Sequence, residues 1–263
     1  MKDSKNILII DDEQVVINSI SKIAEEEGFS FDSVNDASLA LKKISTTDFD
    51  LIICDIMLPE MDGFQFLSKL NSKRIDTPVM MTTGYSTIEN AVKSLYSGAI
   101  EFIPKPFTVD EMTSVISRGM KYSILMKSKK AHDDSIILVP CPSKYFRLGY
   151  SGWMNQEPDG SVSIGATDFF IKTLEQIRKI ELFDINEVLT QAAPSAKFET
   201  EDDLTHQLYA VISGIIIAKN NRLLEEPELL EKDPYFDGWI YRLIPTALDY
   251  EMKLLIPCSS DRA

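Results

Sequence analysis

Short apolar runs alternate with helix-like patterns throughout the first 125 residues of the chain. The runs predict strands at 7–10, 31–34, 51–54, 79–82 and 101–103. The segments between and after them predict helices near 14–27, 37–46, 63–72, 87–97 and 108–121. Strands of this length that alternate with helices are typical of a parallel sheet with helices on both faces. We therefore predict an α/β doubly wound, five-stranded parallel sheet for residues 1–125.

Polar side chains with useful chemistry follow four of these strands. Asp11 and Asp12 follow the first, Asp55 the third, Thr83 closes the fourth, and Lys105 follows the fifth. In this kind of fold, ligands bind beyond the carboxyl ends of the strands. Converging carboxylates repel one another unless a cation lies between them, and Mg²⁺ suits a few carboxylates completed by water and a phosphate oxygen. The sequence therefore predicts a magnesium site that receives a phosphoryl group.

Four segments carry a resemblance: ILIIDDE, LIICDIMLPEMDGF, MMTTGYS and FIPKPF. They resemble the receiver domain of bacterial two-component response regulators, over about the first 120 residues. The resemblance implies that Asp55 accepts a phosphoryl group from a sensor histidine kinase. It implies that Asp11 and Asp12 hold Mg²⁺, with Asp12, Asp55 and the backbone carbonyl of Met57 as the direct ligands.

The same resemblance assigns the remaining site residues. It implies that Thr83 and Lys105 grip the phosphoryl oxygens, that the Lys105–Pro106 peptide bond is cis, and that Phe102 is the switch side chain that turns inward when Thr83 is engaged. Taken singly, these residues have ordinary explanations as helix caps, turn residues and loop hydroxyls. The receiver interpretation rests on their joint occurrence at the ends of successive strands.

Residues 126–140 have the charged, polar composition of a linker, and residues 141–263 form a second domain with β-type patterns. The turn sequence 158–160 precedes an alternating strand at 161–164, and short helices are expected at 168–176 and 227–231. We predict a mainly β domain with few short helices.

The second half resembles the H protein of the glycine cleavage system, over about 145–256. The segments GWMNQEPDGSVSIGATDF, IELFDINEV and LYAVISGIIIAKNNRLLEEPELLEKDPYFDGWIYRL carry this resemblance. It implies a barrel-sandwich hybrid fold. In that family a lysine at a hairpin tip carries the lipoyl group, but alignment here places Asp202 or Asp203 at that position. A carboxylate cannot form the amide to lipoate, so no lipoate is expected. Asn186 and Ala192 stand where the family commonly has turn glycines.

Charge limits the kinds of partner that are expected, and cysteine content bears on the cellular compartment. There are 27 Lys and Arg against 41 Asp and Glu, a net charge of −14. Because nucleic acids and membrane surfaces are anionic, neither is an expected partner. Cys54, Cys141 and Cys258 are odd in number and widely separated, which favours reduced thiols in a cytoplasmic protein without an export signal. Of the two histidines, His206 is interpreted as a surface polar residue.

Together these features predict a cytoplasmic response regulator of a phosphorelay. Phosphorylation of Asp55 would control the second domain, which acts as an interaction module for an unknown protein target. The protein would be no enzyme beyond, at most, slow autodephosphorylation. Two alternatives stay open: a lipoyl carrier gated by phosphorylation, and a regulator that acts through the receiver alone. An apolar stripe along 112–124 leaves open whether the last helix packs in the core or forms a homodimer seam.

Overall fold

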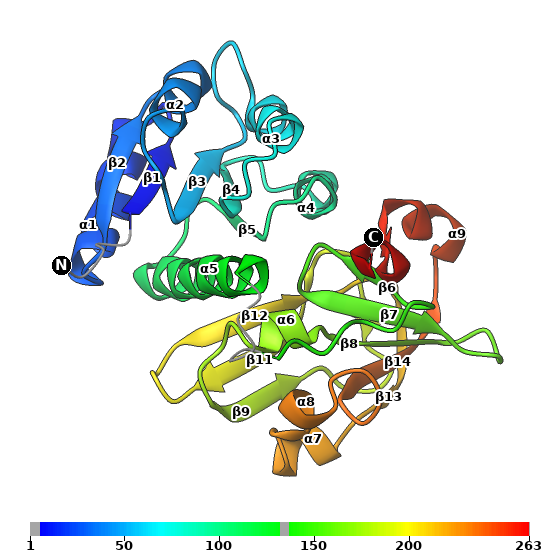
Figure 1. Ribbon diagram of the computed structural model, residues 1–263. Helices are drawn as coiled ribbons and strands as arrows, with labels where there is room; N and C mark the ends of the chain where they lie inside the picture. The colour runs from blue at the N-terminus through cyan, green and yellow to red at the C-terminus, as the bar shows by residue number, and fades with distance from the viewer. Residues whose placement is uncertain (1–5, 132–136, 263) are drawn as a thin grey trace. The chain divides into compact units, whose positions relative to one another are not determined.

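The computed structural model describes residues 6–131 and 137–262, which form two compact units with the main boundary at Ile137 (Figure 1). Residues 132–136 of the predicted linker, with His132, lie outside the described residues. Each unit has its own sheet and its own buried core. Within the described ranges, no helix is long and apolar enough to cross a lipid bilayer.

The first unit contains a parallel sheet in the order β2-β1-β3-β4-β5, so the predicted doubly wound fold is confirmed. Its strands are β1 (Asn6–Ile10), β2 (Ser30–Val34), β3 (Leu51–Asp55), β4 (Val79–Thr83) and β5 (Glu101–Pro104). Its helices are α1 (Gln14–Glu26), α2 (Ala37–Ile44), α3 (Gly63–Ser72), α4 (Ile88–Tyr96) and α5 (Val109–Lys130).

The register of the central strands brings their carboxyl ends to one edge. Ile10 lies opposite Cys54, Asp55 opposite Thr82, and Thr83 opposite Pro104. All five residues of β3 and of β4 are buried, because helices cover both faces of a parallel sheet. The polar residues after each apolar run are therefore held at the rim of a rigid core.

Helix α5 is longer than the sequence pattern predicted. It begins at a capping box of Thr108 and Glu111 and continues to Lys130, through residues expected to start the linker. Lys127 pairs with Asp50 and Lys130 pairs with Asp76. Cations in the last turn interact favourably with the helix dipole, so a lysine-rich segment that resembles a linker here prolongs the helix.

The second unit is antiparallel and β-rich, as predicted. One sheet has the order β10-β13-β14-β8-β7-β6-β15 and another the order β12-β11-β9. The strands are β6 (Phe146–Leu148), β7 (Gly152–Gln156), β8 (Val162–Ala166), β9 (Ile177–Leu182), β10 (Val188–Leu189), β11 (Pro194–Thr200), β12 (Thr205–Tyr209), β13 (Gly214–Lys219), β14 (Trp239–Pro245) and β15 (Ile256–Pro257). The α-helices are α6 (Asp168–Ile171), α7 (Arg222–Glu225), α8 (Leu229–Lys232) and α9 (Leu248–Glu251), with 3₁₀ turns at Met252–Leu254 and Cys258–Arg262.

Local expectations for this unit are met in part. β7 and β8 form the predicted hairpin, and Asp159 accepts hydrogen bonds from both the backbone N–H and the hydroxyl of Ser161 in its turn. The helix expected over 168–176 ends at Ile171. The placement of His206 on the surface is wrong: it is 1% exposed, because alternation along β12 turns it and Leu208 inward.

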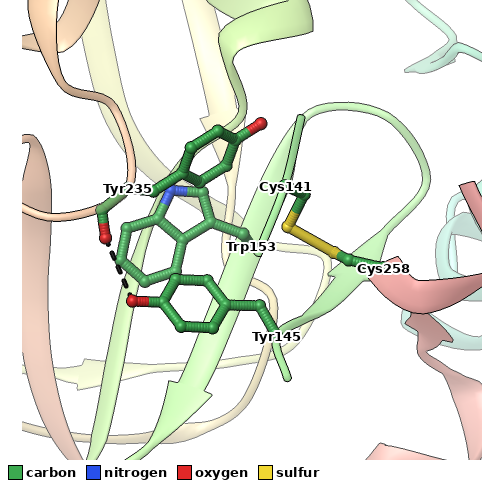
Figure 2. Close-up of a cluster of buried hydrophobic side chains, with 5 residues drawn as sticks. All are labelled: Cys141, Tyr145, Trp153, Tyr235 and Cys258. Carbon is green, nitrogen blue, oxygen red and sulfur yellow. Dashed lines mark hydrogen bonds between the residues drawn. A yellow bond between two sulfur atoms is a disulfide. The ribbon is translucent and has the colours of Figure 1, made fainter. Parts of the chain in front are cut away.

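The expectation of three reduced thiols is also wrong. Cys141 and Cys258 form a disulfide whose Cα atoms are 5.7 Å apart, although 117 residues separate them in the sequence, and only Cys54 is free. Figure 2 shows this bond beside the rings of Tyr145 and Trp153. The topology explains the pairing: β15 lies antiparallel to β6, so the end of the chain returns to the start of the domain.

We expect the disulfide to stabilise the second unit by closing a long loop in the unfolded chain. Cys141→Ser with Cys258→Ser should lower the free energy of unfolding by about 2–5 kcal/mol. Both tryptophans, Trp153 and Trp239, belong to this unit, so denaturant unfolding followed by tryptophan fluorescence measures it directly. Cys54→Ala should leave that transition in place. Alkylation of all three thiols in denaturant without reductant would contradict the pairing.

Candidate functional site

Three side chains from the ends of three strands meet at the rim of the first unit. The ammonium of Lys105 lies 2.7 Å from Asp11 Oδ2 and 3.0 Å from Asp55 Oδ1. Asp11 is 1% exposed and Asp55 3% exposed, so this is a buried cluster of two carboxylates and one cation. Glu13 approaches Lys105 to 3.3 Å from the solvent side. Sequence reasoning missed Glu13, although it continues the acidic run that begins at Asp11.

Backbone groups fix both carboxylates in position. The N–H of Met57 donates to Asp55 Oδ2 at 2.7 Å, and the N–H of Glu13 donates to Asp11 Oδ1 at 3.0 Å. Each bond comes from the residue two positions further on, where the chain leaves the strand and turns. The strand end and its loop therefore orient each carboxylate, as a nucleophile or metal ligand requires.

Burial and charge shift the pKa values of this cluster. Burial raises the pKa of Asp11, against the opposing effect of Lys105. Burial lowers the pKa of Lys105, but its hydrogen bonds to Asp11 and Asp55 outweigh this, and the net pKa is raised. Lys105 therefore keeps its positive charge to a higher pH than an ordinary lysine does. Burial, with the neighbouring Asp55 carboxylate, raises the pKa of the Cys54 thiol well above its ordinary value, so Cys54 supplies no thiolate.

The other predicted site residues lie around this cluster. Thr83 is fully buried and its Oγ1 accepts a hydrogen bond from the N–H of Tyr85 at 3.1 Å. Phe102 is 4% exposed on β5, and the Lys105–Pro106 peptide bond is cis. The side chains of Met57 and Tyr85 are 53% and 69% exposed. Neither carries a carboxylate or carboxamide.

The donors suit a hard divalent cation in chemistry, though they are not gathered into a metal cluster. Asp12 is exposed, and over the described part of the chain no group of three His, Cys, Asp or Glu side chains is arranged to hold a metal. Apart from their contacts with the Lys105 ammonium, the buried Asp11 Oδ2 and Asp55 Oδ1 have no hydrogen-bond partner among the described residues. Mg²⁺ takes few protein carboxylates and keeps several waters, so this set of oxygens fits it.

In the second unit, Asp202 and Asp203 lie in the turn between β11 and β12. Asp203 has a left-handed backbone, with φ of 62°, and its carboxylate lies 2.7 Å from Arg178. Within the turn, Asp202 accepts a hydrogen bond from Thr200. Both candidate positions for the carrier lysine are therefore acidic side chains at a hairpin tip.

Asn186 and Ala192 have φ values of 74° and 59°. Glycine adopts this region without strain, whereas an alanine there costs about 1–2 kcal/mol. The backbone thus keeps a glycine-type geometry at two turns where the side chains have changed.

Two family models match the chain. Residues 7–117 match the response regulator receiver domain, and residues 144–259 match the glycine cleavage H-protein. The two matches follow one another along the chain without overlap.

Individual relatives match one part of the chain. The regulatory protein AtoC of Escherichia coli is 34% identical over 121 residues, which are 46% of this chain and 26% of AtoC. The transcriptional regulatory protein TcrA of Mycobacterium tuberculosis is 33% identical over 40% of this chain and 42% of its own length. The chain thus covers less than half the length of either relative.

Solved structures are similar to each half. A CheY-like response regulator receiver domain protein from Methanospirillum hungatei is 33% identical, with a TM-score of 0.44, over 47% of this chain and 98% of its own. A glycine cleavage system H protein from Mycobacterium marinum is 24% identical, with a TM-score of 0.38, over 40% of this chain and 86% of its own.

Proposed function

We propose that this chain, a response regulator receiver domain followed by a glycine cleavage H-protein domain, works as the phosphoacceptor of a sensor histidine kinase. The observation that carries the proposal is the Asp55 carboxylate, buried at the end of β3 with the Lys105 ammonium 3.0 Å away. A carboxylate so held is a positioned nucleophile beside a fixed positive charge. Receiver domains are signalling modules, and the relatives matched by the first unit are regulators.

Phosphoryl transfer would form one bond and break one. An oxygen of Asp55 attacks phosphorus, the P–N bond of the phosphohistidine breaks, and its electron pair returns to the imidazole. Lys105 would balance the charge on the phosphoryl oxygens, and the Thr83 hydroxyl would donate a hydrogen bond to one of them. Mg²⁺, held by Asp11, Asp12, Asp55 and the carbonyl of Met57, would spread charge away from the phosphoryl group.

The consequence of phosphorylation would pass through Thr83. Its hydroxyl oxygen accepts from the backbone of Tyr85, so movement of Thr83 toward a phosphoryl oxygen would carry the loop after β4 with it. Phe102 on the adjacent strand β5 would then repack. The H-protein domain would serve as the output, through an interaction with a protein target, and nucleic acids and membranes would not be partners.

We expect one phosphoryl group per chain after incubation with a small phosphodonor such as acetyl phosphate and Mg²⁺. Asp55→Asn should abolish labelling, because an amide is not a nucleophile at neutral pH, and removal of Mg²⁺ with EDTA should suppress it. Asp48→Asn, in the exposed loop before β3, is the matched control and should label fully. Intact-mass measurement reads the result, and undiminished labelling of Asp55→Asn would refute the assignment.

We also expect the aspartyl phosphate to be long-lived. Hydrolysis needs a water in line with the scissile bond, and neither Met57 nor Tyr85 can orient one, although both flank the site. Met57→Asn with Tyr85→Glu should accelerate decay by about tenfold or more, since loss of positioning costs orders of magnitude in rate. Tyr250→Glu, equally exposed in the second unit, should leave decay unchanged. Decay within seconds in the native protein would contradict this expectation.

The acidic hairpin tip predicts that the native protein takes up no lipoyl group. Expression with lipoate and a lipoyl ligase should leave its mass unchanged, because a carboxylate cannot be acylated to an amide. Asp203→Lys restores an amine at the left-handed position of the tip and should gain one lipoyl group. Glu201→Lys, two residues away, is the control. A lipoyl adduct on the native protein would favour a carrier function instead.

A further inference from the structure

A hollow of about 670 Å³ opens on one face of the large sheet in the second unit. Strands β7, β8, β13 and β14 contribute to its lining, together with Tyr145 and the segment before β14. Pockets of about 300–1,000 Å³ are typical of small-molecule sites. The hollow is separate from the Asp203 hairpin tip, no residue of which lines it.

Aromatic rings form its apolar wall. Figure 2 shows Tyr145, Trp153 and Tyr235 side by side. The ring centroids of Trp153 lie 4.9 Å from Tyr145 and 6.1 Å from Tyr235, and those of Tyr145 and Tyr235 lie 6.4 Å apart. The indole N–H of Trp153 donates to Pro234 O and the hydroxyl of Tyr145 donates to Tyr235 O, so their polar atoms are already bonded. Trp153 is 1% and Tyr145 4% exposed, so these two rings form the buried back of the hollow. Trp239 adds a partly exposed ring at the edge.

Gly165 makes this wall rigid. A Cβ at Gly165 would lie 2.6–2.9 Å from three atoms of the Trp153 indole, so the ring lies directly on the backbone of β8. Asn155 and Ser163 lie opposite each other on the same sheet face, next along β7 and β8. The side chains of Asn155 and Ser163 therefore form the polar floor of the hollow, next to its aromatic wall.

Glu157 is the charged group that this floor orients. Its Oε1 accepts from Asn155 Nδ2 at 2.9 Å and from Ser163 Oγ at 2.7 Å. Among the residues that the structure describes, none hydrogen-bonds to its Oε2 and no cation lies within ion-pair distance of it. The carboxylate is half-buried, held by two donors, and lacks a counter-ion.

The other charges of the lining are already engaged. Arg242 bonds Ser161 at 2.8 Å and Asp159 at 3.2 Å, and Asp237 lies 3.7 Å from Arg222. The ammonium of Lys144 lies 5.5 Å from the centre of the Tyr145 ring, within the range of a cation–π contact. The aromatic wall thus already accepts an alkylammonium from the chain itself.

Two carboxylates act on the Tyr145 hydroxyl at the back of the hollow. Burial raises the pKa of the Tyr145 hydroxyl, and the carboxylates of Glu157 and Asp233 raise it further. The negative potential of those two groups therefore reaches the aromatic wall.

We propose that this hollow binds an alkylammonium group, with Glu157 as its counter-ion and the partly exposed ring of Trp239 against its methylene groups. An ammonium that enters would give Glu157 the ion pair that it lacks, and its alkyl chain would cover aromatic surface. A free small amine and a lysine side chain of a partner protein share this chemistry.

The two tryptophans of the chain both line the hollow, so the intact protein carries its own probe. Tryptophan fluorescence would be titrated with n-butylammonium, 1-butanol and pentanoate at fixed ionic strength. We expect a saturable change with n-butylammonium, and affinity lower by about tenfold or more for the neutral alcohol, since the alcohol cannot form the ion pair with Glu157. A capped Gly-Lys-Gly peptide forms a second arm: saturation with it indicates a lysine of a partner, and saturation with the free amine alone indicates a small molecule.

Glu157→Gln keeps the size and most hydrogen bonds of the side chain but removes its charge. It should weaken n-butylammonium binding by about tenfold. Glu231→Gln, an exposed carboxylate outside the hollow, is the matched control and should bind as the native protein does. Equal binding of the alcohol or of pentanoate, unchanged affinity in Glu157→Gln with a native unfolding transition, or no saturable change with any ammonium would each overturn the proposal.

Discussion

The candidate site of the first unit depends on the burial of two carboxylates against one ammonium. Asp11 and Asp55 share Lys105, so the buried group carries one more negative than positive charge. A buried ion pair gains little net stability, because desolvation offsets most of the Coulomb attraction. The arrangement is therefore better explained by chemistry than by folding. It places a nucleophile beside a fixed ammonium in a buried site and leaves a deficit of positive charge that a divalent cation would fill.

Parallel strands explain how residues far apart in sequence reach this site. Strands β3 and β4 are buried throughout, so the polar side chains of the site appear where these strands end. The sequence shows these ends clearly: Asp11, Asp55 and Lys105 each follow an apolar run. This is why the sheet, its order of elements and the assembly of the cluster were predictable. The ion-pair distances were not predictable, because the sequence pattern does not show how closely each carboxylate approaches Lys105.

Several of the errors depended on contacts between residues distant in the sequence. The end of α5 was placed too early because its lysines pair with Asp50 and Asp76 in loops of the same unit. The Cys141–Cys258 bond depends on the return of β15 to β6, which no local pattern reveals. Glu157 was missed because its lack of a counter-ion is a property of the lining, not of its neighbours in sequence.

The positions of the two tryptophans make it possible to measure whether phosphorylation of Asp55 affects the hollow of the second unit. The receiver contains no tryptophan, whereas both tryptophans lie in the hollow of the second unit. Any change in tryptophan fluorescence on phosphorylation of Asp55 would therefore report on the second unit. Coupling between two sites is reciprocal: a factor by which phosphorylation alters ammonium affinity must equally alter the phosphorylation equilibrium when the ammonium is bound. If phosphorylation of Asp55 alters binding to the H-protein domain, then binding to that domain must alter the phosphorylation equilibrium of Asp55. If the two equilibria are independent, phosphorylation of Asp55 does not control the second domain through this hollow.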